Sequence, residues 1–421
     1  MEILETRRNR VFDLMQENSA LILFAGAAKI HSEDEFLPYD ANRNFFYLTN
    51  IEQENSVLLM IKGIGERKIY LFVDEYNETK EKWTGRRLTN DEASYISGIE
   101  NIYSTGSYEN MLSLALARDN NQYGQISHLY IDLSPELKIK DEFYTKDLAK
   151  FVENEYPHIE VINLHPSLTK LRMIKQSDEI ANLIKAINLT NEGIHEMILN
   201  LKEGLYEHDL ADIFEMYGRK NGRHPLAFST IVASGKNATC LHYPSQNDIV
   251  KEDDLILFDL GYKNEGYCAD ISRTFPVNGV FKGTQKKVYE AVLNTNKAVI
   301  TYVRAGMTIA DLQEYAKQCL KAECVRLGLM HKDEDIFKYY FHNVSHHLGI
   351  DTHDVSDRNL PLENGNVITV EPGLYFANLG IGVRIEDDVL IKDGKGECLS
   401  KGIVKEISDV EELMRNLRKG K

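Results

Sequence analysis

The chain has 421 residues, and its 65 acidic side chains outnumber its 49 basic ones, which gives a formal net charge of −16. A chain this acidic is not a general nucleic-acid binder, because binding to the phosphate backbone depends on lysine and arginine. The composition, 43% hydrophobic and 27% charged, excludes a collagen, a coiled coil and a disordered chain. At roughly 100–200 residues per domain, the length predicts two or three globular domains.

The ends and the cysteines indicate a compartment. The N-terminal segment carries acids and lacks the apolar stretch and small-residue cleavage site of a secretory signal. The longest apolar run near it, residues 20–26, is far shorter than the ~20 residues of a membrane-spanning helix and predicts a buried strand. Five cysteines without a Cys-x-x-Cys pair fit neither a disulfide framework nor a structural zinc site. We therefore expect a soluble protein of the reducing cytoplasm, without membrane or nucleic-acid partners.

A change of pattern near residue 171 predicts a domain boundary. Before it, short runs rich in β-branched and aromatic residues alternate with helical or polar stretches, which predicts a small α/β domain over residues 1–171. The strands predicted there, besides residues 20–26, are 56–61, 68–73, 129–133 and 160–164.

Residues 172–421 are predicted to form the second domain, and the fold class of the whole chain is α/β (α+β). Ser177 and Thr284 are expected to cap two long amphipathic helices. A third helix is expected to start at Thr308, where Asp311 completes a near capping box. Strand-like segments between and after these helices carry the candidate chemistry.

Two aspartates lie on the arms of one predicted hairpin. Asn264-Glu265-Gly266 is a turn signal between two apolar, β-rich runs. With the turn centred between Asn264 and Glu265, Asp259 and Asp270 are expected to pair directly, with Cβ atoms ~4.5–5.5 Å apart. Like charges at that spacing destabilise a ladder, so the pair predicts a cation between them.

Glu371 and Glu386 occupy the arms of a second apolar hairpin. A Pro-Gly pair directly after Glu371 interrupts the ladder, so proximity is expected but no register. Four buried carboxylates cost too much free energy unless cations neutralise them, and one divalent ion cannot neutralise four charges. The residues therefore predict two ions. Asp387 and Asp388 are expected to face solvent or to brace the site, because adjacent strand residues point to opposite faces.

Histidine is the expected remaining ligand. Four candidates, His342, His346, His347 and His353, lie close together, and His242 is a further isolated one. Spacing alone does not choose among them. The sequence has no Gly-x-Ser-x-Gly elbow, phosphate loop, dinucleotide-binding loop or His-Glu-x-x-His helix that would indicate a competing site.

These motifs resemble those of the pita-bread dinuclear metallopeptidases, which include aminopeptidase P, prolidase and methionine aminopeptidase. The resemblance implies a pita-bread catalytic domain over residues 172–421, preceded by a creatinase/prolidase-like α/β domain over residues 1–171. It further implies that Asp270 and Glu386 bridge two ions. The five implied ligands are Asp259, Asp270, His346, Glu371 and Glu386.

The first domain makes the chain more similar to aminopeptidase P than to methionine aminopeptidase, which generally lacks such a domain. Residues 42–50 and the segment containing Trp83, Arg86 and Arg87 resemble segments of aminopeptidase P. Taken alone, Trp83 is a core aromatic and the two arginines are a solvated face. We expect Trp83 and the arginines to border an open substrate groove, in a homodimer or homotetramer. The stretch joining the arms of the second hairpin is short for aminopeptidase P, so prolidase, which cleaves Xaa-Pro dipeptides, stays as the alternative.

The resemblance implies hydrolysis of the first peptide bond in peptides with proline at the second position. In that reaction Glu371 is expected to shuttle the proton from water to the leaving nitrogen, and His353 and His242 are expected to donate hydrogen bonds to the oxyanion. His347 receives no role. Substrate-handling or supporting positions are implied for His342, Tyr375, Arg384 and Trp83.

The implied ligands favour a particular metal and bear on two alternative protein classes. Four of the five implied ligands are oxygen donors, which favours manganese, while cobalt, iron and zinc also fit. Members of this fold that have lost the ligands serve as binding modules, and the presence of all five argues against that class here. A dinuclear phosphoesterase requires cations for phosphate, and apart from Arg384 no cluster of lysine or arginine adjoins these motifs.

Overall fold

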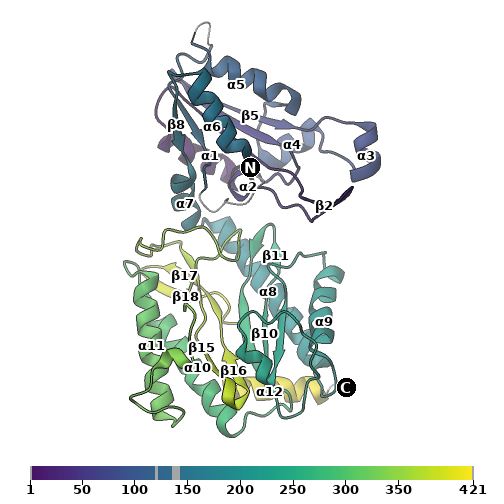
Figure 1. Cartoon of the computed structure of the whole chain (residues 1–421), viewed down its shortest axis with the longest axis vertical. Helices are drawn as coiled ribbons and strands as arrows, with labels where there is room; N and C mark the ends of the chain where they lie inside the picture. The colour runs from purple at the N-terminus through teal and green to yellow at the C-terminus, as the bar shows by residue number, and fades with distance from the viewer. Residues whose placement is uncertain (1, 119–121, 135–142, 420–421) are drawn as a thin grey trace. The chain divides into compact units, whose positions relative to one another are not determined.

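The structure is a computed structural model that describes residues 2–118, 122–134 and 143–419. The chain divides into two compact units, Met1–Thr169 and Lys170–Lys421, and each has a hydrophobic core of its own (Figure 1). Among the described residues, no helix is both long and apolar enough to cross a membrane.

The first unit is built on a six-stranded mixed sheet with the order β6-β5-β4-β1-β7-β8. The central strand β1 pairs antiparallel with β4 and parallel with β7, and both β1 and β4 are almost fully buried. The elements are α1 (Glu2–Leu14), β1 (Ser19–Phe24), β2 (Ile30–Ser32), β3 (Glu35–Phe36), α2 (Arg43–Thr49), β4 (Val57–Gly63), β5 (Glu66–Val73), α3 (Glu78–Thr84), α4 (Asn90–Ser97), β6 (Ile102–Ser104), η1 (Thr105–Ser107), α5 (Tyr108–Leu116), β7 (His128–Ile131), α6 (Phe143–Glu155), β8 (Glu160–Asn163) and α7 (His165–Met173), the last of which runs past the boundary.

The apolar runs of the sequence predict this sheet well. The five predicted strands are β1, β4, β5, β7 and β8, each within a few residues of its expected bounds. These runs supply the buried residues of the unit's core, which explains why their pattern is visible in the sequence. The α/β class predicted for this part of the chain is confirmed.

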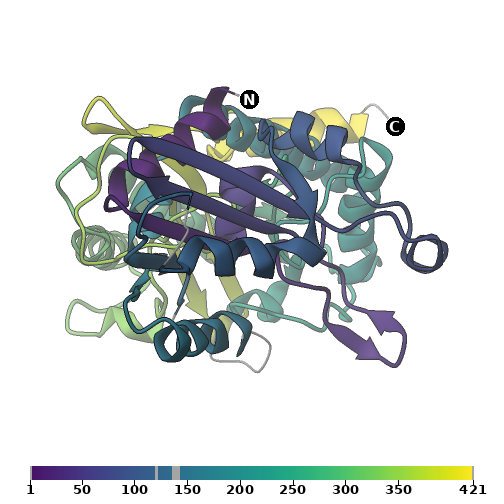
Figure 2. The same cartoon turned by 90° about the horizontal axis from the view of Figure 1, so that it is seen from above.

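Two segments extend from the first unit without burying any side chain. The hairpin β2–β3 and the helix α3 project away from the six-stranded sheet (Figure 2). Ile30 is 68% exposed and Trp83 is 76% exposed, so Trp83 is not a core aromatic.

The second unit surrounds short antiparallel sheets with helices. In Figure 1, α8 and α9 lie beside β10, and α10 and α11 lie beside β15–β18. The sheet orders are β13-β10-β9, β11-β12, β14-β17-β18 and β15-β16. The elements are α8 (Ser177–Asn200), α9 (Glu207–Lys220), β9 (Ile231–Ser234), η2 (Gly235–Thr239), β10 (Leu255–Leu260), β11 (Lys263–Asn264), β12 (Tyr267–Cys268), β13 (Ile271–Pro276), α10 (Gly283–Tyr302), α11 (Ile309–Arg326), η3 (Ile336–Lys338), β14 (Val367–Val370), β15 (Gly373–Phe376), η4 (Ala377–Leu379), β16 (Ile381–Arg384), β17 (Asp387–Lys392), β18 (Lys395–Cys398) and α12 (Ile407–Lys419).

The three predicted helices exist, but two of their caps differ from expectation. Thr308 caps α11 through a capping box with Asp311, as predicted. The cap of α8 is Gln176 and not Ser177, and the cap of α10 is Lys282 and not Thr284. Ser177 is already helical because the side chain of Glu179 reaches back to the backbone N–H of Gln176.

The predicted register of the first hairpin is wrong by two residues. Asp259 pairs with Ser272, and Asn264 pairs with Tyr267, so the turn is formed by Glu265 and Gly266. Both turn residues have positive φ, 47° and 81°, a conformation that is uncommon for glutamate. A shift of two residues keeps every side chain on its face of the ladder, so Asp259 and Asp270 are diagonal neighbours on one face.

The second hairpin has a continuous register on both sides of its interruption. Val370 pairs with Asp387, and Gly373 pairs with Arg384. Counting inward from either pair places Glu371 opposite Glu386. Both glutamates lie in the gap between the paired strands, where the proline prevents a regular ladder.

Gly382 in β16 provides a test of this packing. A Cβ atom there would lie 1.9 Å from the carbonyl oxygen of Ala238 in η2. Gly382→Ala must push η2 away from β16, and we expect it to destabilise the fold by about 1–3 kcal/mol, measured as a lower unfolding midpoint. Gly402→Ala is the matched control, because Gly402 is exposed and has open space at the Cβ position; its expected effect is below about 0.5 kcal/mol. Equal midpoints for the two variants would contradict the close contact.

Candidate metal centre

Three side chains from separate segments converge in the second unit. Donor atoms of Asp270, His346 and Glu386 all lie within 4.8 Å of one another. The Nε2 atom of His346 is 3.3 Å from Oδ2 of Asp270 and 3.6 Å from Oε1 of Glu371. Oxygen and imidazole donors at such spacing fit a divalent cation.

The carboxylates of this cluster are buried close to one another. Burial raises the pKa of Asp270 well above its ordinary value, and the negative charges of Asp259, Asp388 and Glu371 raise it further. Burial and the charge of Asp270 do the same to Glu386. The pKa of Glu371 is raised to about 7 by burial, although His346 and Arg384 oppose the shift. Without added positive charge, the cluster therefore holds protons that ordinary carboxylates lack.

Asp259 lies at the side of this group, bound to Arg384. The guanidinium donates from Nη2 to Oδ2 of Asp259 at 2.6 Å and from Nε to Oγ of Ser272 at 2.7 Å. Ser272 in turn donates to Oε2 of Glu386 at 2.8 Å. Sequence reasoning missed Ser272, although it lies two residues after Asp270 and so occupies the same strand face.

Tyr375 joins Arg384 to a histidine. Its hydroxyl is 3.1 Å from Nη1 of Arg384 and 2.9 Å from Nε2 of His342. The other ring nitrogen of His342 is 3.6 Å from Oε2 of Glu371. Burial lowers the pKa of His342 to about 3, and the charge of Arg384 adds to this, so the imidazole is neutral. The guanidinium and phenol thus orient a neutral histidine beside the carboxylates.

The remaining histidines differ in position. Nδ1 of His346 lies 3.1 Å from the carbonyl oxygen of His347; a carbonyl only accepts, so Nδ1 carries the proton and Nε2 faces the carboxylates. The rings of His346 and His353 pack edge to face, with their centroids 4.3 Å apart. His242 is exposed, and its charge contributes to lowering the pKa values of His342 and His353, for both of which desolvation is the larger cause.

Of the two alternatives expected for Asp387 and Asp388, solvent exposure is wrong, because both are fully buried, and bracing of the site is what their contacts support. Asp387 accepts hydrogen bonds from Arg273 at 2.8 Å and Lys405 at 2.6 Å, so it braces the strands behind the cluster. Asp388 accepts from the backbone N–H of Asp270 at 3.3 Å. Both aspartates support the cluster from the protein interior.

The segment with Trp83 belongs to the first unit. Trp83 lies in α3, Arg86 pairs with Glu92, and the backbone N–H of Arg87 donates to Glu81. No contact of this segment with the metal cluster follows from the geometry of either unit alone.

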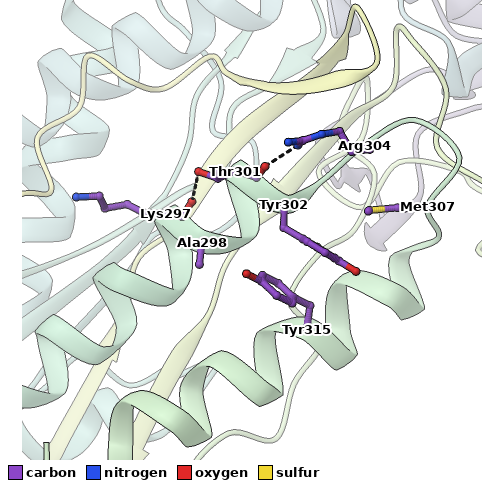
Figure 3. A pocket seen from close by; sticks show the side chains of 7 residues that line it. All are labelled: Lys297, Ala298, Thr301, Tyr302, Arg304, Met307 and Tyr315. Atoms are coloured by element: carbon purple, nitrogen blue, oxygen red, sulfur yellow. Dashed lines mark hydrogen bonds between the residues drawn. The ribbon is translucent and has the colours of Figure 1, made fainter. Parts of the chain in front are cut away.

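A separate cavity lies between α10 and α11 (Figure 3). It measures about 610 Å³, and the rings of Tyr302 and Tyr315 stack in it with centroids 3.8 Å apart. Its two cations already have partners: Lys297 pairs with Glu406, and Arg304 donates to the carbonyl oxygens of Thr301 and Val303. None of the predicted site residues lines it.

Comparison with known proteins identifies the family of this fold and cluster. Residues 181–393 match metallopeptidase family M24, and residues 4–123 match the N-terminal domain of aminopeptidase P. The chain belongs to metallopeptidase family M24. The matched range contains every residue of the cluster described above.

Relatives within this family extend over the whole chain. The Xaa-Pro aminopeptidase of Haemophilus influenzae is 32% identical over 98% of this chain and 97% of its own length. A Bacillus anthracis structure, provisionally described as an aminopeptidase P, superimposes with a TM-score of 0.93 at 38% identity, covering 99% of this chain and 98% of that one. Aminopeptidase P from E. coli with the inhibitor Pro-Leu gives a TM-score of 0.89 at 28% identity and covers 99% of both chains.

The raised pKa values predict proton release on metal binding. A cation must displace the protons held by Asp270, Glu371 and Glu386, so metal affinity should rise with pH, about tenfold per unit for each displaced proton, and fall below pH 7. Titrating chelator-treated protein with Mn²⁺ in buffers of different ionisation enthalpy measures this release. Glu371→Gln should lower it by about half a proton at pH 7, because a group with a pKa of about 7 is half protonated there. An affinity independent of pH would contradict the electrostatics of the cluster.

Proposed function

We propose that this protein is a metal-dependent Xaa-Pro aminopeptidase, which hydrolyses the first peptide bond of peptides with proline at the second position. The observation that carries the proposal is the buried cluster of Asp270, His346 and Glu386 within a chain of family M24. The match of the first unit to the N-terminal domain of aminopeptidase P favours this activity over that of a methionine aminopeptidase.

We propose that the protein binds two divalent ions and that Asp259, Asp270, His346, Glu371 and Glu386 would hold them. The fit rests on Asp270, His346 and Glu386, whose donor atoms lie within 4.8 Å of one another, and on Nε2 of His346, which faces Asp270 and Glu371. Oxygen-rich donors of this kind suit Mn²⁺ best, and Co²⁺, Fe²⁺ and Zn²⁺ are the alternatives to be tested. Asp259 must then share its carboxylate between an ion and Arg384.

The chain's own residues have separate tasks in the proposed reaction. When bound, the two ions lower the pKa of a water molecule and polarise the scissile carbonyl. Glu371 would accept a proton from the attacking water and pass it to the leaving nitrogen. His353 and His242 donate hydrogen bonds to the developing oxyanion, and His342, fixed by Tyr375 and indirectly by Arg384, lines the substrate site.

The same proposal includes proline specificity. A proline at the second position makes the scissile bond a tertiary amide without an N–H, so the site must accept a ring in place of that hydrogen bond. A dipeptidase must also hold the free carboxylate of proline, whereas an aminopeptidase leaves room for the chain to continue. We propose that Trp83, Arg86 and Arg87 border this open side.

We further propose that the protein is a cytoplasmic homodimer or homotetramer. The hairpin β2–β3 and α3 support self-association, because they expose Ile30, Phe36 and Trp83 and bury none of their own residues. A partner subunit would cover this apolar surface. The cysteines in the described part of the chain are all free thiols, which suits a reducing compartment.

Replacing single histidines separates metal ligand from catalyst. His346→Ala should lower the bound metal content, because Nε2 is lost from the cluster. His353→Ala should retain metal and lower kcat by roughly 10²–10³, as expected for the loss of an oxyanion donor. His331→Ala, at an exposed position after α11, is the control and should change neither quantity. Metal loss in both site variants, or in neither, would refute this division.

Substrate length decides between aminopeptidase and prolidase. We expect kcat/KM for Xaa-Pro-Yaa-Zaa to exceed that for Xaa-Pro with the same Xaa, because the continuing chain enters an open groove. Xaa-Ala-Yaa-Zaa is the control for proline specificity and should be a poor substrate. Hydrolysis confined to the dipeptide would overturn the aminopeptidase assignment in favour of prolidase.

A further inference from the structure

A buried ion cluster lies directly behind the histidine segment of the second unit. Oδ1 of Asp354 accepts from Nη2 of Arg172 at 2.5 Å, and Oδ2 accepts from Nζ of Lys175 at 2.9 Å. The side chains of Arg172, Lys175 and Asp354 are at most 2% exposed. Arg172 also pairs with Asp351 at 3.0 Å, so two cations face two carboxylates.

The chain closes tightly around this cluster. A Cβ atom at Gly349 would lie 2.3 Å from Oδ2 of Asp354 and 3.0 Å from the side chain of Lys175, so the backbone itself packs on the ion pair. Burial raises the pKa of Asp354, but Lys175 and Arg172 outweigh it and set the pKa to about 2. The carboxylate is therefore ionised throughout the working pH range.

Asp354 connects this cluster to the metal centre through its backbone. Its N–H donates to the carbonyl oxygen of His347 at 2.9 Å, the same oxygen that accepts from Nδ1 of His346. His353, the preceding residue, has its ring edge to face with His346. The two aspartates bound by Arg172 flank residues 352 and 353, so the segment that presents His353 is tied down at both ends.

We propose that Asp354, held by Arg172 and Lys175, is a positioning residue that fixes the imidazole of His353 against the metal centre. The inference rests on the proposed role of His353 as an oxyanion donor. Such a donor acts only in a narrow range of position, so the loss of its anchor lowers the rate although no substrate contact is removed. An ion cluster that only stabilised the fold would have no such link to one histidine.

A double-mutant cycle tests the inference in the full-length, Mn²⁺-loaded enzyme. The variants are His353→Ala, Asp354→Asn and the two together, each assayed for kcat, KM and bound metal on Xaa-Pro-Yaa-Zaa. Asp354→Asn should retain both ions and lower kcat by roughly 10–100-fold, with a smaller change in KM. When His353 is already alanine, the same substitution should lower kcat by less than about twofold, because the two residues act as one unit.

Two further variants keep the test independent of folding. Asp354→Asn alone leaves an excess buried cation, whereas Asp354→Asn with Lys175→Met removes one charge of each sign and leaves Arg172 paired with Asp351. This neutral variant should show the same loss of kcat and the same dependence on His353. Asp357→Asn is the matched control, because Asp357 is exposed on the same segment, and its kcat should stay within about twofold of the unaltered enzyme.

The outcomes separate the inference from the function on which it rests. An unchanged kcat in His353→Ala would overturn the proposed role of His353 and the inference with it. A large effect of His353→Ala that multiplies with the effect of Asp354→Asn would leave His353 as a catalytic residue and overturn the positioning role of Asp354.

Discussion

Repulsion among buried carboxylates is the constraint on which the second unit depends. Burial and mutual repulsion raise the pKa values of Asp270 and Glu386, and burial raises that of Glu371, while Arg384 opposes all three shifts. Burying like charges in this way lowers the stability of the fold. The arrangement is explained by cations that the reaction requires, and the shells of residues behind the cluster serve to keep these acids in place.

Two acids behind the centre, Asp387 and Asp354, are compensated by cations. Burial raises the pKa of Asp387, but Arg273 and Lys405 outweigh it and hold the value well below its ordinary range. Asp354 is compensated in the same way by its two cations. Asp270, Glu371 and Glu386 thus keep raised pKa values, whereas Asp387 and Asp354 are neutralised by permanent ion pairs. The paired acids supply rigidity, so that the unpaired ones are fixed in position when a cation arrives.

The sequence predicted the elements and the centre better than it predicted their connections. Apolar runs predicted β1, β4 and β10, and the residue types predicted Asp270 and Glu386, whereas His346 was selected from the histidines only by the family resemblance. The register of the first hairpin failed, because it depends on a positive φ at Glu265 that no local preference favours. The pair of Lys175 with Asp354 joins residues 179 positions apart, so no periodicity or motif could indicate it.

The predicted proximity of Asp259 and Asp270 survives the wrong register, because a shift of two residues keeps side chains on the same strand face. A slip of two residues leaves each aspartate on its face, whereas a slip of one would have turned Asp270 away from Asp259. The position of each carboxylate then depends on where the strand pairing is interrupted. Asp270 precedes β13, and Glu371 and Glu386 lie opposite each other between paired strands. Backbone that is free of ladder hydrogen bonds can turn its side chains inward, and this is where the chain places three of its acids. The regular strands therefore determine on which side of the sheet each carboxylate lies, and the interruptions of the strands determine where the carboxylates meet.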